Sequence, residues 1–314
     1  MSRTLVAVTC DRDRWEFELL VRSMDKFLEP CKVIFVYNQN AEYVKAWKKF
    51  YKRSCQPYLD KFDVKILFKD DFWSLSDENH LTPPELEGHV DQQIIKLGVS
   101  KFVDTEHYIT IDAKNFFIKP THIDNIAQII PAPTSWCEPN LKTWIVTCCE
   151  TLTVAVPQSD IRLTQNTTPY TMRTQSARDL VDYFGGIPFL YKWFTIEARK
   201  GKHCAAEFFL YEIFTIRFGY RNLGNDTQNC ITLWEHMHSV DHWRFKNYIN
   251  HIDHMQEQYN VHMAGLHKGL RPYLTVEEVT EILHRFNVHD IIPDNIPFTG
   301  EKSYSNRLNN YSRA

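Results

Sequence analysis

Short apolar runs alternate with helix-spaced segments over the first 120 residues, and this alternation restricts the fold more than any other feature. The apolar, β-branched runs are at residues 4–10, 32–40, 64–70 and 108–112, and the helix-spaced segments are at 15–28, 42–53 and 92–103. Strands separated by helices pair in parallel, because only a long crossover returns the chain to the same sheet edge. We therefore predict an α/β fold with a doubly wound, mostly parallel sheet.

The rhythm changes after residue 120. We predict antiparallel strands at 143–149 and 152–158, and helices at 177–184, 204–219, 240–259 and 275–286. This gives the fold a mixed C-terminal half. No stretch rich in Pro, Gly or Ser marks a linker, so we predict one continuous domain over residues 1–292 and a loose polar tail at 293–314.

Composition excludes several classes of protein. The 314 residues are 43% hydrophobic and 24% charged with a net charge of −3, which suits a globular enzyme and gives no reason to expect a nucleic-acid partner. The N-terminal apolar run is too short for a signal peptide, and no window approaches the roughly 18 apolar residues of a spanning helix. The eight cysteines form no CxxC pair, so we expect reduced thiols and a cytoplasmic location.

Polar side chains follow the predicted strands. Asp11, Asn38, Asp70 and Asp112 stand where the apolar runs stop, and the carboxyl ends of parallel strands form the usual ligand-binding edge. In YITIDAKNFFIKP (108–120), Asp112 occupies the first position of an Asp-x-Asp pair, but the second position is Lys114. Taken alone, Asp-Ala-Lys also suits a turn that ends a strand with a solvated salt bridge.

The order of several motifs resembles the GT-A class of nucleotide-sugar glycosyltransferases. The motifs are TCD (9–11), QQIIKL (92–97), ITIDAKNFFIKP (109–120), CAAEFFLYEIF (204–214) and GLHK (265–268). Within that class the chain is most similar to bacterial proteins of polysaccharide gene clusters whose strand motif reads Leu-Asp-Ala-Lys-Asn. The likeness spans roughly residues 3–285.

This resemblance implies a hexosyl- or related transferase that moves a sugar from a UDP-, GDP- or CMP-linked donor to a bacterial surface glycan such as capsule or O-antigen. Residues 1–120 are expected to bind the nucleotide and 121–292 the acceptor. The expected donor-binding residues are Thr9, Asp11, Asn38, Lys96, Asp112, Lys114, Asn115, His267 and Lys268. Two alternatives stay open: a non-catalytic nucleotide-sugar-binding pseudoenzyme, and another nucleotide-dependent transferase on the same fold.

A departing diphosphate needs positive charge, which Mg²⁺ or Mn²⁺ held by acids usually supplies. Here Lys96, Lys114, His267 and Lys268 would take over that task as point charges. Alternatively, Asp112 and His267 would hold a metal ion. The pattern slightly favours a metal-independent site.

The candidate catalytic residues are Asp112 and Glu207. Glu207 is the candidate general base, because apolar neighbours favour a carboxylate with a raised pKa. The alternative for Glu207 is a position on the wet face of its helix, the face exposed to solvent. For Lys96 the alternative is likewise an exposed helical position. Asn115 suits either a hydrogen bond to the sugar or a brace for the turn. Tyr170 and Arg173 are candidate acceptor-binding residues.

Two further segments carry weaker signals. His236, His238 and His242 have spacing that would suit zinc, although packing or acceptor contacts explain them more simply. The segment KAWKKFYKR (45–53) mixes cations with aromatics. A solvated helix face is its simpler interpretation, and it leaves peripheral association with the plasma membrane, or contact with a lipid-linked acceptor, open.

Overall fold

The computed structural model describes residues 3–73, 84–126, 129–131, 142–155, 168–200, 206–220, 223–225, 229–234 and 245–301. Its main sheet has the strand order β3-β2-β1-β4-β7. The strands are β1 (Arg3–Thr9), β2 (Lys32–Tyr37), β3 (Asp63–Phe68), β4 (His107–Asp112) and β7 (Tyr170–Arg173). The first four are parallel and β7 is antiparallel to β4. The predicted mostly parallel sheet is confirmed.

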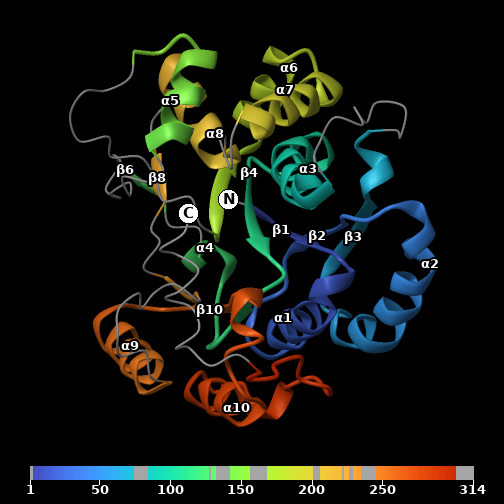
Figure 1. Ribbon diagram of the computed structural model, residues 1–314, viewed down its shortest axis with the longest axis vertical. Helices are drawn as coiled ribbons and strands as arrows, with labels where there is room; N and C mark the ends of the chain where they lie inside the picture. The colour runs from blue at the N-terminus through green and yellow to red at the C-terminus, as the bar shows by residue number, and fades with distance from the viewer. Residues whose placement is uncertain are drawn as a thin grey trace.

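Helices cover both faces of this sheet (Figure 1). On one face lie α1 (Arg14–Phe27) and α2 (Ala41–Phe50), and on the other lies α3 (Pro84–Gly98). Residues of β1 alternate between the two cores: Leu5 and Ala7 pack with α1, whereas Val6 and Val8 pack with α3. A strand buried on both faces reads as a continuous apolar run, which is how β1 appears in the sequence.

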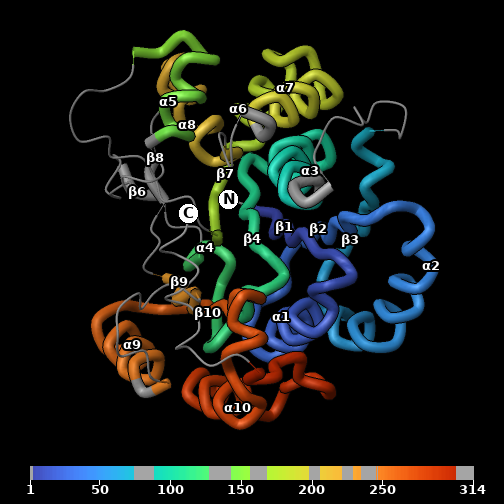
Figure 2. The backbone as a smooth tube through the Cα atoms, viewed as in Figure 1, coloured from blue at the N-terminus to red at the C-terminus, as the bar shows by residue number. Residues whose placement is uncertain are grey.

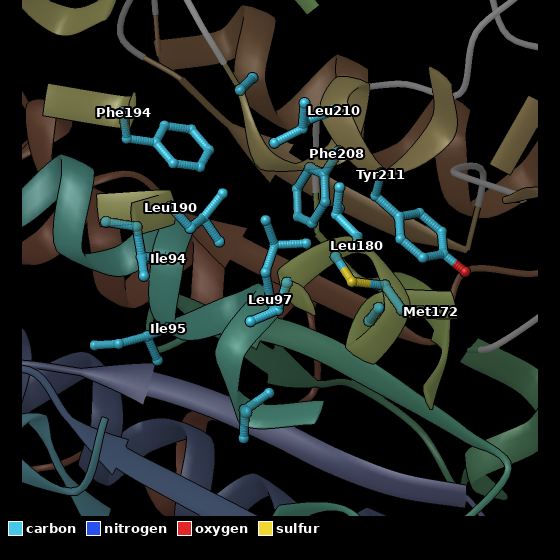
Figure 3. Close-up of a cluster of buried hydrophobic side chains, with 14 of the residues drawn as sticks. Ile94, Ile95, Leu97, Met172, Leu180, Leu190, Phe194, Phe208, Leu210 and Tyr211 are labelled. Atoms are coloured by element: carbon cyan, nitrogen blue, oxygen red, sulfur yellow. The ribbon is translucent and has the colours of Figure 1, made fainter. Parts of the chain in front are cut away.

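The core on the α3 face also includes α6 (Thr174–Tyr183), α7 (Ile187–Lys200) and α8 (Glu207–Arg217). Figure 3 shows Ile94 and Leu97 of α3 gathered with Leu190 of α7 and Phe208 of α8. Burying side chains of this size stabilises the fold by about 1.5–3 kcal/mol each. This packing holds α3 and α8, which both carry candidate site residues, against the same sheet.

The second sheet confirms the predicted mixed C-terminal half. It has the order β5-β10-β9, where β5 (Asn115–Phe117) is antiparallel and β9 (Cys230–Leu233) parallel to β10 (Met263–Leu266). It packs with α9 (Phe245–Gln258) and α10 (Val276–Arg285), at the opposite end of the molecule from α6 and α7 (Figure 2). The short elements β6 (Ile129–Pro131), β8 (Leu223–Asn225) and α4 (Ile123–Ile126) complete this half.

Only Ala113 and Lys114 separate β4, the last parallel strand of the main sheet, from β5 of the second sheet. The chain therefore passes from one sheet to the other at the DAKN motif. This junction places Asp112 and Lys114 at the point where the chain passes between the two sheets.

The predicted strand at 152–158 is not formed over residues 152–155, and residues 156–158 lie outside the described part. Two further predictions are wrong. Residues 143–149 were expected to form a strand but belong to the helix α5 (Lys142–Thr151), because Ile145, Cys148, Cys149 and Leu152 are buried at helical spacing and α5 packs on α8. The tail was expected to be loose from residue 293, but Phe298 is buried and the Trp15 indole donates to the Pro293 carbonyl. Residues 302–314 lie outside the described part, as do His236, His238 and His242.

None of the helices in the described ranges combines the length and apolar character needed to cross a bilayer. The described cysteines are all free thiols.

Candidate active site

Two adjoining cavities open at the carboxyl ends of β1, β2 and β4. The central cavity, of about 360 Å³, is lined by Lys96, Asp112, Lys114 and Glu207 among others. The side cavity, of about 450 Å³, is lined by residues that follow β1 and β2. Both cavities share Val8, Asp13, His89, Gln92 and Lys268 in their walls. They therefore form one continuous depression at the edge where parallel sheets bind ligands.

Asp112 accepts contacts on both of its carboxylate oxygens. Oδ1 lies 2.6 Å from Gln92 Nε2 and 3.0 Å from Lys96 Nζ, while Oδ2 accepts from Thr168 Oγ1 at 3.2 Å and pairs with the Lys114 ammonium. Burial alone would raise the pKa of Asp112, but Lys114 and Lys96 outweigh it and hold this pKa well below its usual range. Asp112 is an anion clamped between two cations.

Lys96 connects the two halves of the site. Its Nζ lies 3.0 Å from Asp112 Oδ1 and 3.0 Å from Glu207 Oε1, and 5.0 Å from the centre of the Phe208 ring. Burial alone would lower the pKa of Lys96, but Asp112 and Glu207 raise it above its usual value. The structure thus excludes the exposed helical position and makes Lys96 a buried, permanently charged ammonium.

Glu207 is the first residue of α8 and is buried beside the central cavity. The wet-face alternative is therefore wrong. A carboxylate at a helix N-terminus is favoured by the helix dipole, and here it also pairs with Lys96. The apolar neighbours seen in the sequence are real, but they do not leave Glu207 without a cation.

Asn115 is fully buried beneath the cavity and braces the turn. Its Oδ1 accepts from the Asp112 backbone N–H at 3.0 Å and from Thr168 Oγ1 at 2.9 Å. A Cβ at Gly265 would lie 2.8 Å from Asn115 Nδ2, so only glycine fits at that point of β10. These contacts favour the turn-bracing role over a hydrogen bond to the sugar.

His267 follows β10 directly, Lys268 begins the 3-10 turn Lys268–Leu270, and both line the central cavity. The His267 ring stacks on Trp234 with 4.3 Å between centroids, and its Nδ1 accepts from the Gly269 N–H at 3.2 Å. The Lys114 ammonium lies 5.3 Å from the centre of the Trp234 ring. The structure thus brings Lys96, Lys114 and Lys268 to one cavity from three separate elements.

The donor atoms around Asp112 do not fit a divalent metal ion. Mg²⁺ and Mn²⁺ need several oxygen ligands, whereas both Asp112 oxygens already face ammonium groups. His267 Nδ1 accepts a hydrogen bond from the Gly269 N–H. Nowhere in the described ranges do three or more His, Cys, Asp or Glu side chains gather in a way that would hold a metal. In this structure Asp112 is thus paired with cations of the protein itself.

Thr9 and Asn38 line the side cavity at the ends of β1 and β2. Both are buried, and within the described part of the chain Thr9 Oγ1 and Asn38 Oδ1 have no hydrogen-bond partner. A buried polar atom without a hydrogen-bond partner costs free energy. Such atoms are common at ligand sites, where the bound ligand supplies the missing partner. Asp11, by contrast, lines neither cavity, and its Oδ1 accepts from Arg14 and from the Tyr37 hydroxyl.

The two candidate acceptor residues lie away from both cavities. Tyr170 is fully buried, stacks on Phe208 at 4.1 Å and donates to Glu212 Oε2. Arg173 is the β-ladder partner of His107 at the amino end of β4, whereas the cavities open at the carboxyl end. Tyr170 therefore supports the cavity wall from behind, through Phe208.

Sequence reasoning missed Gln92 and Thr168, both of which contact Asp112. Gln92 stands one turn before Lys96 in the QQIIKL segment, so the helical spacing was a signal that could have found it. Thr168 is 56 residues from Asp112 in the chain, and no local pattern marks it.

Residues 6–259 match a family described as "Family of unknown function (DUF6492)", and the chain belongs to this family. A search of curated protein sequences finds no match. The solved structures that are similar to the chain at low identity include three glycosyltransferases. Mouse xyloside xylosyltransferase 1 in its apo form has 10% identity and a TM-score of 0.43, with 84% of this chain and 97% of that one covered.

The apo form of the glycosyltransferase GlyE from Streptococcus pneumoniae TIGR4 has 8% identity and a TM-score of 0.41, over 93% of this chain and 62% of GlyE. The apo bifunctional glycosyltransferase WbbM has 8% identity and a TM-score of 0.47, over 92% of this chain and 51% of WbbM. The chain thus spans less than two thirds of the GlyE and WbbM chains.

Proposed function

We propose that this member of the DUF6492 family is a glycosyltransferase that moves a sugar from a nucleotide-sugar donor to a glycan hydroxyl. The observation that carries the proposal is the arrangement of Lys96 and Lys114 around Asp112 in a cavity at the carboxyl end of the sheet. Cations gathered at such an edge suit a phosphorylated ligand. The order of motifs in the sequence supports the same class of reaction.

In this proposal the donor lies across both cavities. The nucleoside occupies the side cavity, where it supplies hydrogen-bond partners for Thr9 Oγ1 and Asn38 Oδ1. Its phosphates lie at the junction, next to Lys268, which lines both cavities. The sugar then extends into the central cavity toward Lys114 and Glu207. Asp11 and Asn115 act through the structure around the donor rather than by contact with it.

The chemical step forms a bond between the acceptor oxygen and the anomeric carbon and breaks the bond from that carbon to the phosphate oxygen. The nucleoside phosphate leaves with the electron pair, and cationic side chains stabilise the charge that develops on it. The acceptor proton passes to Glu207. Lys96 pairs with Oε1 of Glu207, so we assign Oε2 as the atom that faces the acceptor hydroxyl.

We further propose that the reaction needs no metal ion. The charges that bracket Asp112 support this, because Lys96 and Lys114 supply the two positive charges that a divalent ion would bring. When the donor binds, at least one of these ammonium groups must also contact the phosphates. Lys114, whose side chain remains 15% exposed, is better placed to do so than Lys96, at 5%.

The acceptor we propose is a lipid-linked bacterial surface glycan, such as a capsule or O-antigen precursor, reached from the cytoplasmic face of the plasma membrane. A basic surface supports membrane contact. It consists of exposed cations on α2 and the π-helical turn Tyr51–Cys55: Lys45, Lys48, Lys49, Lys52 and Arg53. Five cations on a chain with a net charge of −3 leave the rest of the molecule more acidic, so this surface would orient the protein on anionic lipid.

Calorimetry with UDP-, GDP- and CMP-sugars, each with EDTA and with MgCl₂, tests the function. We expect at least one donor to bind equally well in both solutions, and its nucleotide to be released when a glycan acceptor is added. Binding without any release of nucleotide would make the protein a non-catalytic binder. Binding of no donor would overturn the proposal, and binding only with MgCl₂ would overturn its metal-independence.

A further inference from the structure

A carboxylate lies in the wall of the cavity that we assign to the donor. Glu16, in the first turn of α1, lines the central cavity and is only 3% exposed. An anion buried at this place opposes any phosphate that enters, because two like charges interact strongly where water is excluded. The site therefore needs a cation that neutralises Glu16.

Arg271 is that cation. Its guanidinium donates from Nε to Glu16 Oε1 at 3.0 Å and from Nη2 to Oε1 and Oε2 at 2.6 Å each. Nη2 also donates to the Arg12 carbonyl at 2.7 Å. Arginine–carboxylate pairs of this kind are both strong and fixed in orientation. Arg271 itself is absent from the walls of both cavities, so it does not contact the ligand directly.

Arg271 also belongs to the turn that carries Lys268. The Arg271 N–H donates to the Lys268 carbonyl at 3.1 Å, which closes the 3-10 turn. Lys268 lines the same cavity as Glu16. If Arg271 were missing, Glu16 would be left as an uncompensated buried charge, and Lys268 is a cation of the same wall that it would attract.

We propose that Arg271 is a positioning residue that neutralises Glu16, and that it thereby keeps Lys268 available for the phosphates of the donor. The inference rests on the proposed function for the identity of the ligand, a nucleotide with a phosphate or diphosphate. The charge of Arg271 is therefore used by Glu16 and not by the phosphates.

A purely structural role is the competing explanation, since the same ion pair fastens the turn after β10 to α1. A double-mutant cycle separates the two, with inorganic pyrophosphate as the probe and calorimetry as the measurement. We expect Arg271→Met to weaken pyrophosphate binding about tenfold or more, which corresponds to about 1.4 kcal/mol. Glu16→Gln alone should bind pyrophosphate at least as tightly as the unchanged protein, because it leaves the Arg271 charge in place.

The decisive variant is Glu16→Gln combined with Arg271→Met. It lacks the ion pair, as Arg271→Met does, but it also lacks the buried anion. We expect its affinity to return to within about threefold of the unchanged protein, a difference of less than 1 kcal/mol. If it binds as weakly as Arg271→Met alone, the pair only fastens the turn and the inference is wrong.

A matched control breaks another link between α1 and the C-terminal segment. Lys26 Nζ lies 2.5 Å from Asp290 Oδ1, and neither residue lines either of the two cavities. Lys26→Met should leave pyrophosphate affinity unchanged. If Arg271→Met does not fold, Arg271→Lys replaces it: we expect intermediate affinity, because the charge is kept and the forked contact is lost.

The outcome is separable from that of the proposed function, because pyrophosphate contains no sugar and requires no acceptor. If the double-mutant cycle gives the expected affinities but no sugar is transferred, the inference stands and the proposed function is wrong. If the protein transfers sugar but the double mutant binds pyrophosphate as weakly as Arg271→Met, the proposed function stands and the inference is wrong. Failure of the unchanged protein to bind pyrophosphate or any nucleotide-sugar would overturn both.

Discussion

The ammonium of Lys96 lies 3.0 Å from Glu207 Oε1, and this contact joins residues that are 111 positions apart in the chain. Lys96 comes from α3 and Glu207 from the first turn of α8, so the pair ties the helix that follows the third strand to a helix of the second half. The same ammonium contacts Asp112 at the end of β4. One buried cation thus holds together the carboxylate of the DAKN motif and the candidate base.

This arrangement makes Lys96 important for stability as well as for the site. Lys96→Met leaves the buried Glu207 without its cation and leaves Asp112 with Lys114 alone, and breaking a buried pair costs about 3–5 kcal/mol. We expect urea unfolding to show a loss of that order. Adding Glu207→Gln should recover part of it, because Glu207, which loses its cation, is then replaced by a neutral side chain. Equal stability of Lys96→Met and the unchanged protein would contradict the buried geometry.

Lys114 carries the metal-independent part of the proposal. A charge-assisted contact to phosphate is worth about 1.5–3 kcal/mol, so Lys114→Ala should raise the donor KM or lower kcat by about tenfold or more. The exposed lysine Lys192 on α7 is the matched control, and Lys192→Ala should have no effect. Steady-state kinetics without metal measures both. A Lys114→Ala rate equal to that of the control would remove Lys114 from the mechanism.

Glu207 is the proposed base, and its replacement tests chemistry rather than binding. General base catalysis contributes about 10²–10⁴ to a rate. Glu207→Gln keeps the shape of the side chain, so we expect kcat to fall by at least a hundredfold while the donor dissociation constant changes little. Glu281→Gln, on the exposed face of α10, serves as the control. Full turnover by Glu207→Gln would show that another group takes the proton.

His262 predicts a loss of stability in acid. Burial, with a smaller contribution from Lys119, lowers its pKa from the ordinary 6.5 to about 4. The unfolded chain therefore takes up a proton before the folded one as the pH falls. The contribution of His262 is full above pH 6.5 and is lost between 6.5 and about 4, at no more than about 1.4 kcal/mol per pH unit.

Urea unfolding at pH 7, 5.5 and 4.5 measures this dependence. His262→Gln should make it shallower than in the unchanged protein, because Gln does not titrate in this range. His254→Gln, at an exposed position of α9, should leave the dependence as it was. Identical pH profiles for His262→Gln and His254→Gln would refute the role of His262.

The basic surface of α2 predicts binding to anionic vesicles. Each Lys or Arg close to such a surface contributes about 1 kcal/mol, and salt screens the attraction. We expect the protein to float with phosphatidylglycerol vesicles at low salt and to dissociate at high salt. Replacing Lys45, Lys49 and Lys52 with Glu should abolish flotation, and phosphatidylcholine vesicles should bind neither protein. Flotation that survives these replacements would exclude this surface as the membrane contact.

The fold of the first half follows from local patterns, because strand and helix periods of 2 and 3.6 residues are written into neighbouring positions. The strand ends that carry Thr9, Asn38 and Asp112 could be predicted for the same reason. The prediction failed at α5, where the apolar run 143–149 suits a strand or a buried helix equally well. There the packing of Ile145 and Cys148 against the α8 side of the core decided.

The sequence alone determined a parallel sheet with an anion and a cation, Asp112 and Lys114, at the carboxyl end of a strand. Only the tertiary structure decided which other groups reach them. It brought Lys96 and Glu207 together, gave Arg271 to Glu16 instead of the cavity, and left Tyr170 behind the cavity wall. Contacts of this kind join residues far apart in the chain, where periodicity carries no information, and they are set by how the packed cores orient whole helices and strands toward one another.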